Sequence, residues 1–320
     1  MEQNILSIYI YIMTKLYPKR KPYHTKHYDM GNDIKVYVEF YGNPKGFPAI
    51  YLHGGPGDKC RPTNAQLFNP KKYNIVLMDQ RGSGKSTPGT KHNTTQRMLQ
   101  DMEVIREDMG ENKWLVTGGS WGAALAMLYA QAHPEHTAGL ILRGFTNMHW
   151  HNEFEDCVIR GMNPQRLDRM YSSVGLNYLK ATEKQLTRAY TKKLKSKNKK
   201  TRKRYLELFN DFSDHHVTSK TPKDSYTDMM HGAIVYNHYL KHDWFLKPNQ
   251  MMLKSNIKKV KHIPTTFVHG KFDFICPMEM AWEMHKQLPK SKMVVVQAGH
   301  SVCDKEVAHA VTKASDEFKL

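Results

Sequence analysis

The chain has 320 residues, 40% of them hydrophobic and 11% aromatic, which excludes a disordered or fibrous protein and allows one large domain with a substantial core. Its formal net charge is +18, from 48 Lys and Arg residues against 30 Asp and Glu residues. The cysteines form no C-x-x-C pair and have no zinc-finger spacing, so we expect no bound metal and reduced thiols in a cytoplasmic protein. They are Cys60, Cys157, Cys276 and Cys303.

Residues 1–15 are predicted to be an extension outside the main fold. The apolar run at 5–13 is much shorter than the roughly 20 residues that cross a bilayer. It also lacks the basic start and the cleavage site of a secretory signal. We interpret the run as a short accessory strand or a disordered lead-in, with peripheral membrane contact as the alternative.

Short apolar runs predict the strands of a sheet. Residues 34–41 alternate between apolar and polar, as a half-buried strand does. Later runs do not alternate, which is typical of parallel strands buried on both faces. These runs lie at 49–52, 75–78, 114–116, 140–142, 266–268 and 293–296.

Helical patterns separate several of these runs. Met98, Met102, Ile105 and Met109 recur at helical spacing, after a predicted capping residue, Asn93, with Gln96 three positions later. Strands that alternate with helices predict an α/β fold with a mainly parallel sheet. Further helices are expected at 121–132, 277–288 and 304–318.

The alternation stops between Phe145 and His262. We therefore expect a core formed by 16–145 and 262–320, with 146–261 inserted as a helical cap domain. Within the cap, residues 180–204 hold twelve basic side chains and one acid, or +11 of the total +18. We interpret this run as a solvated helix, although contact with anionic surfaces is an alternative.

A serine sits in a nucleophile-elbow motif. The sequence Gly-Gly-Ser-Trp-Gly at 118–122 matches G-x-S-x-G, follows an apolar strand and precedes a helix rich in small residues. That context favours a sharp turn that exposes the serine hydroxyl at the top of the sheet. Ser120 is therefore the predicted nucleophile.

A serine nucleophile needs a base, and the base needs a carboxylate that orients it. In this architecture the chain order is Ser, then Asp or Glu, then His. Asp273 follows the strand predicted at 265–269, and His300 follows the strand predicted at 293–296. We predict a Ser120, Asp273 and His300 triad, with Asp243 or Asp304 as replacements for Asp273.

The sequence His-Gly-Gly-Pro-Gly at 53–57 predicts part of an oxyanion hole. Backbone N–H groups of such loops face the reacting carbonyl. Pro56 has no N–H, so the donor is Gly54 or Gly55, and Trp121 supplies the other. His53 is expected to be structural, and this chemistry requires no cofactor.

From Leu16 to its carboxyl terminus the chain resembles the proline iminopeptidase family of α/β-hydrolases. The resemblance implies an α/β-hydrolase fold and release of an N-terminal residue, preferably proline, from small peptides. It also implies that Ser120 is the nucleophile, Asp273 the orienting acid and His300 the base, with Gly55 and Trp121 forming the oxyanion hole. The matching motifs are HGGPG at 53–57, DQRGSG at 79–84 with Ser86, GGSWG at 118–122, LRG at 142–144, GKFDFICP at 270–277 and GHS at 299–301.

The resemblance departs at the substrate-binding positions. Members of this family have two cap glutamates that hold the amino group of the substrate, and Ser213 and Tyr236 occupy those positions here. An ammonium group in a partly buried pocket needs a negative partner. Asp211, Asp214 and Asp228 are candidate replacements. Two alternatives therefore stay open: an esterase or amidase on the same scaffold, and a basic protein that binds nucleic acid or lipid. Against the second alternative, only Tyr190 and Tyr205 lie near the basic run at 180–204 to stack on bases.

Overall fold

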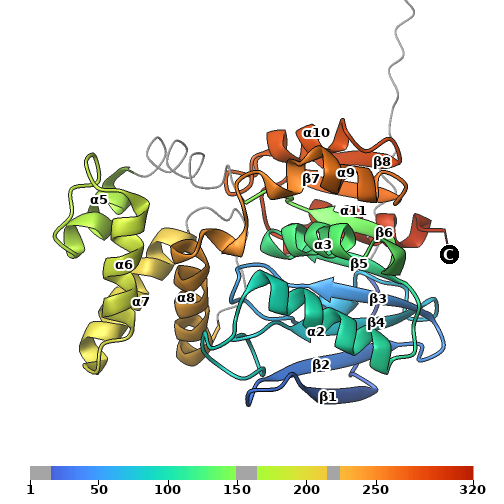
Figure 1. Ribbon diagram of the computed structural model, residues 1–320, viewed down its shortest axis with the longest axis horizontal. Coiled ribbons are helices and arrows are strands. Elements are labelled where there is room, and N and C mark those ends of the chain that lie inside the picture. The colour runs from blue at the N-terminus through green and yellow to red at the C-terminus, as the bar shows by residue number, and fades with distance from the viewer. Residues whose placement is uncertain (1–15, 149–163, 215–223, 320) are drawn as a thin grey trace, which may run out of the picture.

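The computed structural model describes residues 16–148, 164–214 and 224–319, and it is built on one eight-stranded sheet (Figure 1). The strand order is β1-β2-β4-β3-β5-β6-β7-β8. β1 pairs with β2 and β2 with β4 in antiparallel fashion, and all later neighbours are parallel. The strands are β1 (His24–Asp29), β2 (Lys35–Gly42), β3 (Phe47–Leu52), β4 (Tyr73–Asp79), β5 (Trp114–Gly119), β6 (Thr137–Arg143), β7 (Thr265–Gly270) and β8 (Ser291–Val296).

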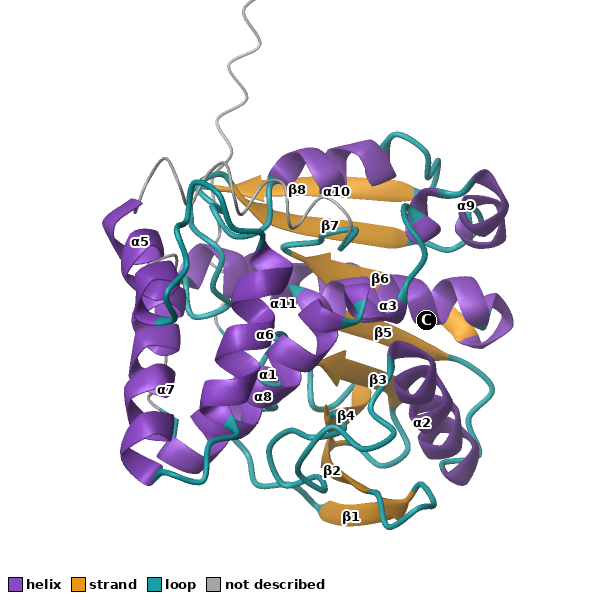
Figure 2. Ribbon diagram, turned by 60° about the vertical axis from the view of Figure 1, so that its left-hand side comes forward, coloured by secondary structure: helices purple, strands orange, loops and turns teal. Residues whose placement is uncertain are grey.

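Helices cover both faces of this sheet (Figure 2). In β3, Ile50 and Leu52 pack on one face, while Ala49 and Tyr51 pack on the other. This two-sided burial explains the apolar runs without alternation. The first face is covered by α2 (Thr95–Asp108), α3 (Trp121–Ala132), α9 (Lys254–Val260) and α10 (Met278–His285), and the second by α1 (Pro62–Ala65) and α11 (Lys305–Glu317).

Two details of the prediction are wrong. The strand at 293–296 is not buried on both faces: it belongs to edge strand β8, where Val295 is 46% exposed because no strand pairs beyond it. The cap of α2 is Thr94, whose side chain accepts from the Arg97 backbone N–H at 3.3 Å. The predicted cap, Asn93, is buried and instead accepts a hydrogen bond from the Tyr239 hydroxyl.

A helical insert lies between β6 and β7, as predicted. It contains α5 (Pro164–Ser173), α6 (Glu183–Leu194), α7 (Lys199–Asp214) and α8 (Tyr226–Lys241), followed by the short helices η2 (Asp243–Phe245) and η3 (Gln250–Met252). Within the described residues 164–214 and 224–261 there is no strand. Leu167, Tyr190 and Leu206 belong to a separate apolar core of this insert.

Helix α8 joins the insert to the sheet domain. Ala233 packs in the core of the insert, whereas Val235 packs in the core beside the sheet. At Gly232 the backbone of α8 touches the loop after β3, since a Cβ there would come within 2.8 Å of the Gly57 carbonyl oxygen. Only glycine allows this approach.

The predicted extension at 1–15 and Cys157 lie outside the described residues. In the part of the chain that is described, every helix is too short or too polar to cross a bilayer.

Candidate active site

Ser120 occupies a sharp turn between β5 and α3. Its φ of 57° and ψ of −127° are strained for a residue that carries a Cβ. Its backbone N–H donates to the Arg143 carbonyl oxygen at 2.8 Å, so the turn is held against the end of β6. This is the strand–turn–helix context expected at Ser120, and it places the hydroxyl at the carboxyl edge of the sheet.

His300 and Asp273 form a hydrogen-bonded pair. Nδ1 of His300 donates to Oδ2 of Asp273 at 2.8 Å. The other carboxylate oxygen accepts from the backbone N–H groups of Ile275, at 3.0 Å, and Cys276, at 2.8 Å. Because one oxygen is fixed by the backbone, the other is aimed at the imidazole.

The Asp273 carboxyl is charged despite its burial. Desolvation raises its pKa, but the charge and hydrogen bond of His300, with smaller contributions from His269 and the Cys276 N–H, outweigh this and hold the pKa at about 2. Burial also lowers the pKa of neighbouring His269, whose Nε2 donates to the Cys276 carbonyl at 2.8 Å. The carboxylate is therefore ready to stabilise an imidazolium on His300.

The turn after β6 connects the serine to the histidine–aspartate pair. Gly144 has a φ of +53°, and a Cβ there would lie 3.1 Å from Cε1 of His300 and 3.2 Å from Oδ2 of Asp273. Ser120 is bound to Arg143, the residue just before Gly144. The chain at 143–144 thus contacts all three members of the predicted triad.

Arg143 is a site residue whose role sequence reasoning missed. Nη1 of its buried side chain donates to the His300 carbonyl oxygen at 2.6 Å. The sequence signal for it was the Leu-Arg-Gly motif at 142–144, at the end of the strand predicted at 140–142. The spacing of this motif by itself does not indicate a role for the arginine. Arg143 fixes the loop that carries the imidazole.

The two replacement acids bind elsewhere. Oδ2 of Asp304 accepts from the Gly299 backbone N–H at 2.9 Å, which shapes the loop before His300. Asp243 pairs with Lys184 at 3.0 Å, and its side chain is 56% exposed. Among these three acids, only Asp273 contacts His300.

The loop at 53–57 lies against the serine. A Cβ at Gly54 would be 3.3 Å from Cβ and 3.9 Å from Oγ of Ser120. Gly55 has a φ of +106°. The Trp121 N–H is in the first turn of α3, where a backbone donor has no acceptor within the helix. Of the three predicted oxyanion-hole residues, Gly54 thus lies against Ser120 and Trp121 directly follows it in the chain.

His53 has the structural role that the sequence predicted. Its Nε2 accepts from the Gln80 N–H at 3.0 Å, and its Nδ1 donates to the Gly54 carbonyl at 2.9 Å. Burial lowers the pKa of His53, which favours this neutral form. Oε1 of Gln80 in turn accepts from the Trp121 indole N–H at 2.8 Å, so a chain of hydrogen bonds joins the loop to α3.

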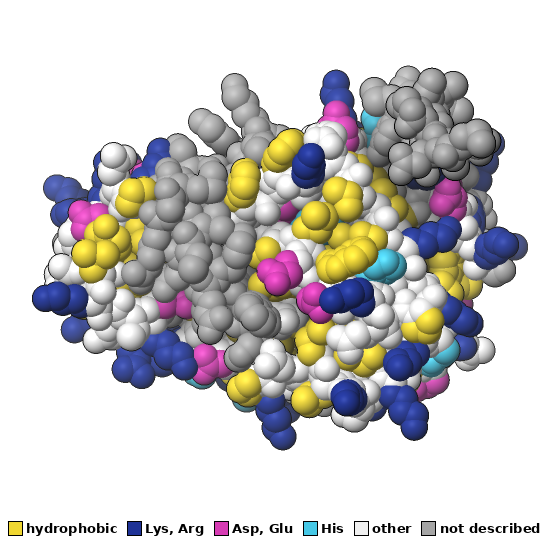
Figure 3. Space-filling model, turned by 90° about the horizontal axis from the view of Figure 1, so that it is seen from above, with side chains coloured by type: hydrophobic (Ala, Val, Ile, Leu, Met, Phe, Trp, Pro, Cys, Tyr) yellow, Lys and Arg dark blue, Asp and Glu magenta, His cyan; other side chains and the backbone are white. Residues whose placement is uncertain are grey.

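Cys276 is a second nucleophilic residue near Ser120, and sequence reasoning missed it. Its buried thiol, which is not in a disulfide, lies 4.0 Å from Ser120 Oγ. On the outside of the same loop, Phe272 and Phe274 are 45% and 39% exposed. Met278 and Trp282 of α10 are also exposed, at 37% and 48%. Apolar side chains are visible across the surface seen from above (Figure 3).

The predicted substrate positions lie in the insert. Tyr236 is on α8, with its ring 5.8 Å from that of Phe209 and 5.8 Å from that of Trp244. Ser213 lies in α7, but its side chain, like that of Asp214, is outside the described part of the structure.

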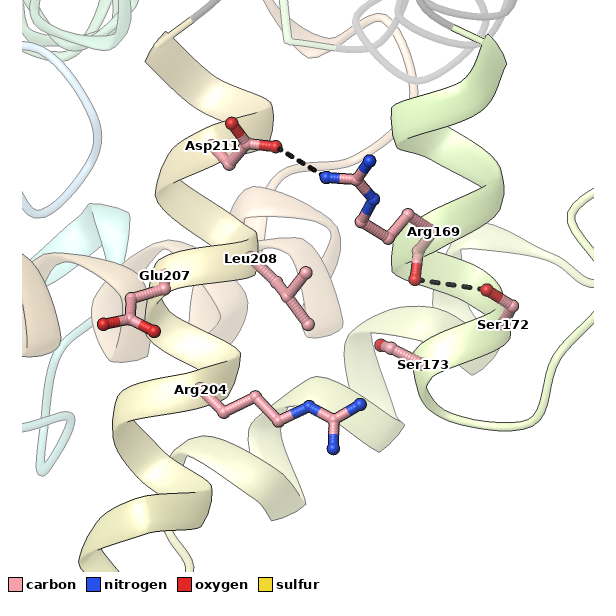
Figure 4. Close-up of a pocket in the computed structure, with 7 residues that line it drawn as sticks. All are labelled: Arg169, Ser172, Ser173, Arg204, Glu207, Leu208 and Asp211. Atoms are coloured by element: carbon pink, nitrogen blue, oxygen red, sulfur yellow. Dashed lines mark hydrogen bonds and ion pairs between the residues drawn. The ribbon is translucent and has the colours of Figure 1, made fainter.

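The other two candidate acids already pair with cations. Asp228 binds Lys59 at 2.7 Å, and Asp211 lies 3.4 Å from Arg166. Asp211 also pairs with Arg169 at 3.8 Å, and both residues line a hollow of about 520 Å³ between α5 and α7 (Figure 4). Neither acid is therefore an uncompensated negative charge for a substrate ammonium.

One group of side chains has the composition of a metal site. The ligand atoms of Glu103, His133 and His136 lie within 4.8 Å of one another. However, Arg106 donates to both carboxylate oxygens of Glu103, at 3.0 and 2.9 Å, and His136 lies 2.7 Å from one of them. Burial raises the pKa of Glu103, but the bonds from Arg106 and Tyr129 outweigh it and hold the pKa at about 2. We interpret the group as an ion-pair network, because a divalent cation would compete with Arg106.

A family model described as the alpha/beta hydrolase fold matches residues 48–307. Solved structures support the same fold, including an alpha/beta fold family hydrolase from Bacillus anthracis, with a TM-score of 0.62, 17% identity, and coverage of 91% of this chain and 99% of that one. A proline iminopeptidase-related protein from Thermus thermophilus has a TM-score of 0.55 at 18% identity, covering 92% and 96% of the two chains. The chain is an α/β-hydrolase.

Relatives of similar sequence identify the family within this fold class. The chain is 35% identical over 331 residues to a probable proline iminopeptidase of Leptolyngbya boryana, covering 96% of this chain and 97% of the relative. It is 33% identical to the proline iminopeptidase of Neisseria gonorrhoeae, covering 95% and 98%. Within the α/β-hydrolases, the chain belongs to the proline iminopeptidase family.

Proposed function

We propose that this hydrolase acts through an acyl-enzyme on Ser120, with His300 as the base and Asp273 as the orienting acid. The observation that carries the proposal is the His300–Asp273 hydrogen bond at 2.8 Å, which lies beside Gly144 and at the same sheet edge as the strained Ser120 turn. This is the order and the set of roles that a serine nucleophile requires.

In the proposed reaction, Ser120 Oγ attacks the scissile carbonyl carbon while Nε2 of His300 takes the hydroxyl proton. The Asp273 carboxylate stabilises the imidazolium. The negative charge that develops on the carbonyl oxygen is bound by the Trp121 N–H and by that of Gly55 or Gly54. His300 then gives its proton to the leaving amine, and water cleaves the acyl-enzyme by the same steps.

We propose release of N-terminal residues, preferably proline, as the activity. The curated relatives named proline iminopeptidase support this substrate class. We further propose that residues 146–261 act as a cap that limits the site to small peptides, over a core of 16–145 and 262–320. We also propose a cytoplasmic location, because Cys60, Cys276 and Cys303 are thiols and not disulfides.

An esterase or amidase is the second candidate, and a specific observation favours it. Tyr236 stands where the family has an ammonium-binding glutamate, and the described acids Asp211 and Asp228 are paired with Arg and Lys. A neutral ester needs no such partner. The side chain at position 236 is therefore expected to affect substrates with an ammonium group and neutral esters differently.

The deciding experiment compares three substrates: a proline arylamide, the same arylamide with its proline nitrogen acylated, and a short-chain nitrophenyl ester. The iminopeptidase proposal expects the free amine to be cleaved with the highest kcat/KM and the acylated one to be resistant. Preference for the ester would establish the second candidate. Ser120→Ala protein, purified in parallel, shows how much activity comes from contaminating hydrolases.

A further inference from the structure

The basic run of the sequence forms one face of a helical hairpin, which we define as residues 184–204 of α6, the following turn and the start of α7. The apolar side chains of Tyr190, Leu194 and Tyr205 point into the core of the insert and are buried. Most lysine and arginine side chains of the hairpin are exposed, and the hairpin lies at the left of Figure 1, away from the strands. The exposed ones include Arg188, Lys192, Lys195, Lys197, Lys199 and Lys200.

Their spacing concentrates like charge. Lys184, Arg188 and Lys192 follow one another at intervals of four, so they form a single stripe along α6. Lys199 and Lys200 occupy the first turn of α7, where the helix dipole is already positive. Both arrangements destabilise the isolated helices, and a bound polyanion would remove that repulsion.

Few acids neutralise the hairpin. Lys184 pairs with Asp243 at 3.0 Å and Lys203 with Glu207 at 3.8 Å, both on the surface. Over the described parts of the chain, the six exposed residues named above make no ion pair with an acid. The hairpin is therefore a concentrated positive surface.

We propose that the 184–204 hairpin binds the phosphate backbone of nucleic acid, independently of hydrolysis at Ser120. Insertion into a lipid surface requires exposed large apolar side chains. The hairpin exposes none. Tyr190 and Tyr205 are buried with their rings 5.5 Å apart, so they are not free to stack on bases. Lysine and arginine without stacking partners recognise phosphates and not sequence.

The length of the hairpin sets the size of the contact. Helix α6 has 12 residues, or a length of about 18 Å, which corresponds to about five base pairs of a duplex. We expect about four to six phosphate contacts, with similar affinity for duplexes of different sequence.

The test measures fluorescence anisotropy of a labelled duplex of about 20 base pairs with protein that carries no affinity tag. Affinity should fall on the order of 10²- to 10³-fold between about 50 and 200 mM salt, as four to six released counterions require. The variant carries Arg188→Glu, Lys192→Glu and Lys195→Glu. The matched control changes three exposed lysines of the sheet domain by the same charge: Lys45→Glu, Lys71→Glu and Lys91→Glu.

We expect at least a tenfold loss of affinity in the hairpin variant and at most about threefold in the control. Equal losses would overturn the proposal, because bulk charge would then explain the binding. So would lack of binding at about 50 mM salt, or binding to phosphatidylserine vesicles without binding to the duplex. If circular dichroism shows that the triple variant is unfolded, Lys199→Gln with Lys200→Gln replaces it, and unchanged affinity there would also overturn the proposal.

Discussion

Nη1 of Arg143 donates to the His300 carbonyl oxygen at 2.6 Å, while the backbone carbonyl of the same arginine accepts from the Ser120 N–H at 2.8 Å. One residue at the end of β6 thus holds the loop of the proposed base and the turn of the proposed nucleophile. Small displacements between such groups slow a reaction more than they weaken substrate binding.

Replacing Arg143 with methionine should therefore act mainly on kcat. Loss of a charge-assisted hydrogen bond typically costs about 1.5–3 kcal/mol, so we expect kcat to fall about 10- to 100-fold with little change in KM. Steady-state kinetics on the best substrate measures both constants, and thermal denaturation checks the fold. A change in KM alone would contradict the positioning role of Arg143.

Ser120 and Cys276 are both capable of nucleophilic attack, and their reactive atoms are 4.0 Å apart. We expect Ser120→Ala to lower kcat on the order of 10⁶-fold, since removal of a nucleophile has that effect in other serine hydrolases. Cys276→Ala keeps the backbone N–H that binds Asp273, so its kcat should stay within about tenfold of the wild type. The reverse order of the two effects would assign the reaction to the cysteine.

Asp273→Asn should slow hydrolysis by roughly 10⁴-fold while leaving the protein folded, because an amide no longer selects the required imidazole tautomer. Asp304→Asn is the matched control, as that carboxylate binds the Gly299 N–H and not His300. We expect a much smaller effect from it. Equal kcat values for wild type and Asp273→Asn would require another acid to orient His300.

The pKa of about 2 at Asp273 makes a prediction about pH dependence. Above the ordinary carboxyl pKa of 3.8 this group is charged and its contacts favour the folded state; that contribution is lost as the pH falls toward 2. Between about pH 4 and 2, the free energy of unfolding should therefore fall more steeply for the wild type than for Asp273→Asn, which denaturation at a series of pH values measures. Equal losses in the two proteins would show that the Asp273 carboxylate does not stabilise the fold.

Tyr236→Glu introduces an acid at a position to which the sequence resemblance assigns binding of the substrate amino group. We expect kcat/KM for a proline arylamide to rise by roughly 5- to 150-fold, the range of a charge-assisted contact. Tyr236→Gln controls for loss of the aromatic ring, and the nitrophenyl ester controls for general effects on the site. Equal effects of the two variants, or equal gains on amine and ester, would contradict a role for this position in binding the ammonium.

The local sequence predicted the elements that carry the proposed catalytic residues. Ser120 is surrounded by glycines between an apolar strand and a small-residue helix, and Asp273 and His300 follow apolar runs. Parallel strands end at the same sheet edge, so residues after them meet there. Strand β1 was missed because only Tyr28 of its six residues is buried, which leaves no apolar run to detect.

The sequence by itself determined the fold class, the helical insert and the identity of the nucleophile, acid and base candidates, because each depends on local pattern and chain order. Only the tertiary structure decided that Asp273, and neither Asp243 nor Asp304, contacts His300, and that Arg143 joins the two loops. It also placed Asp211 and Asp228 in ion pairs, and gathered the basic run on the outer face of two packed helices. These are contacts between residues far apart in the chain, and they follow from how the strands and helices pack, which no local pattern encodes.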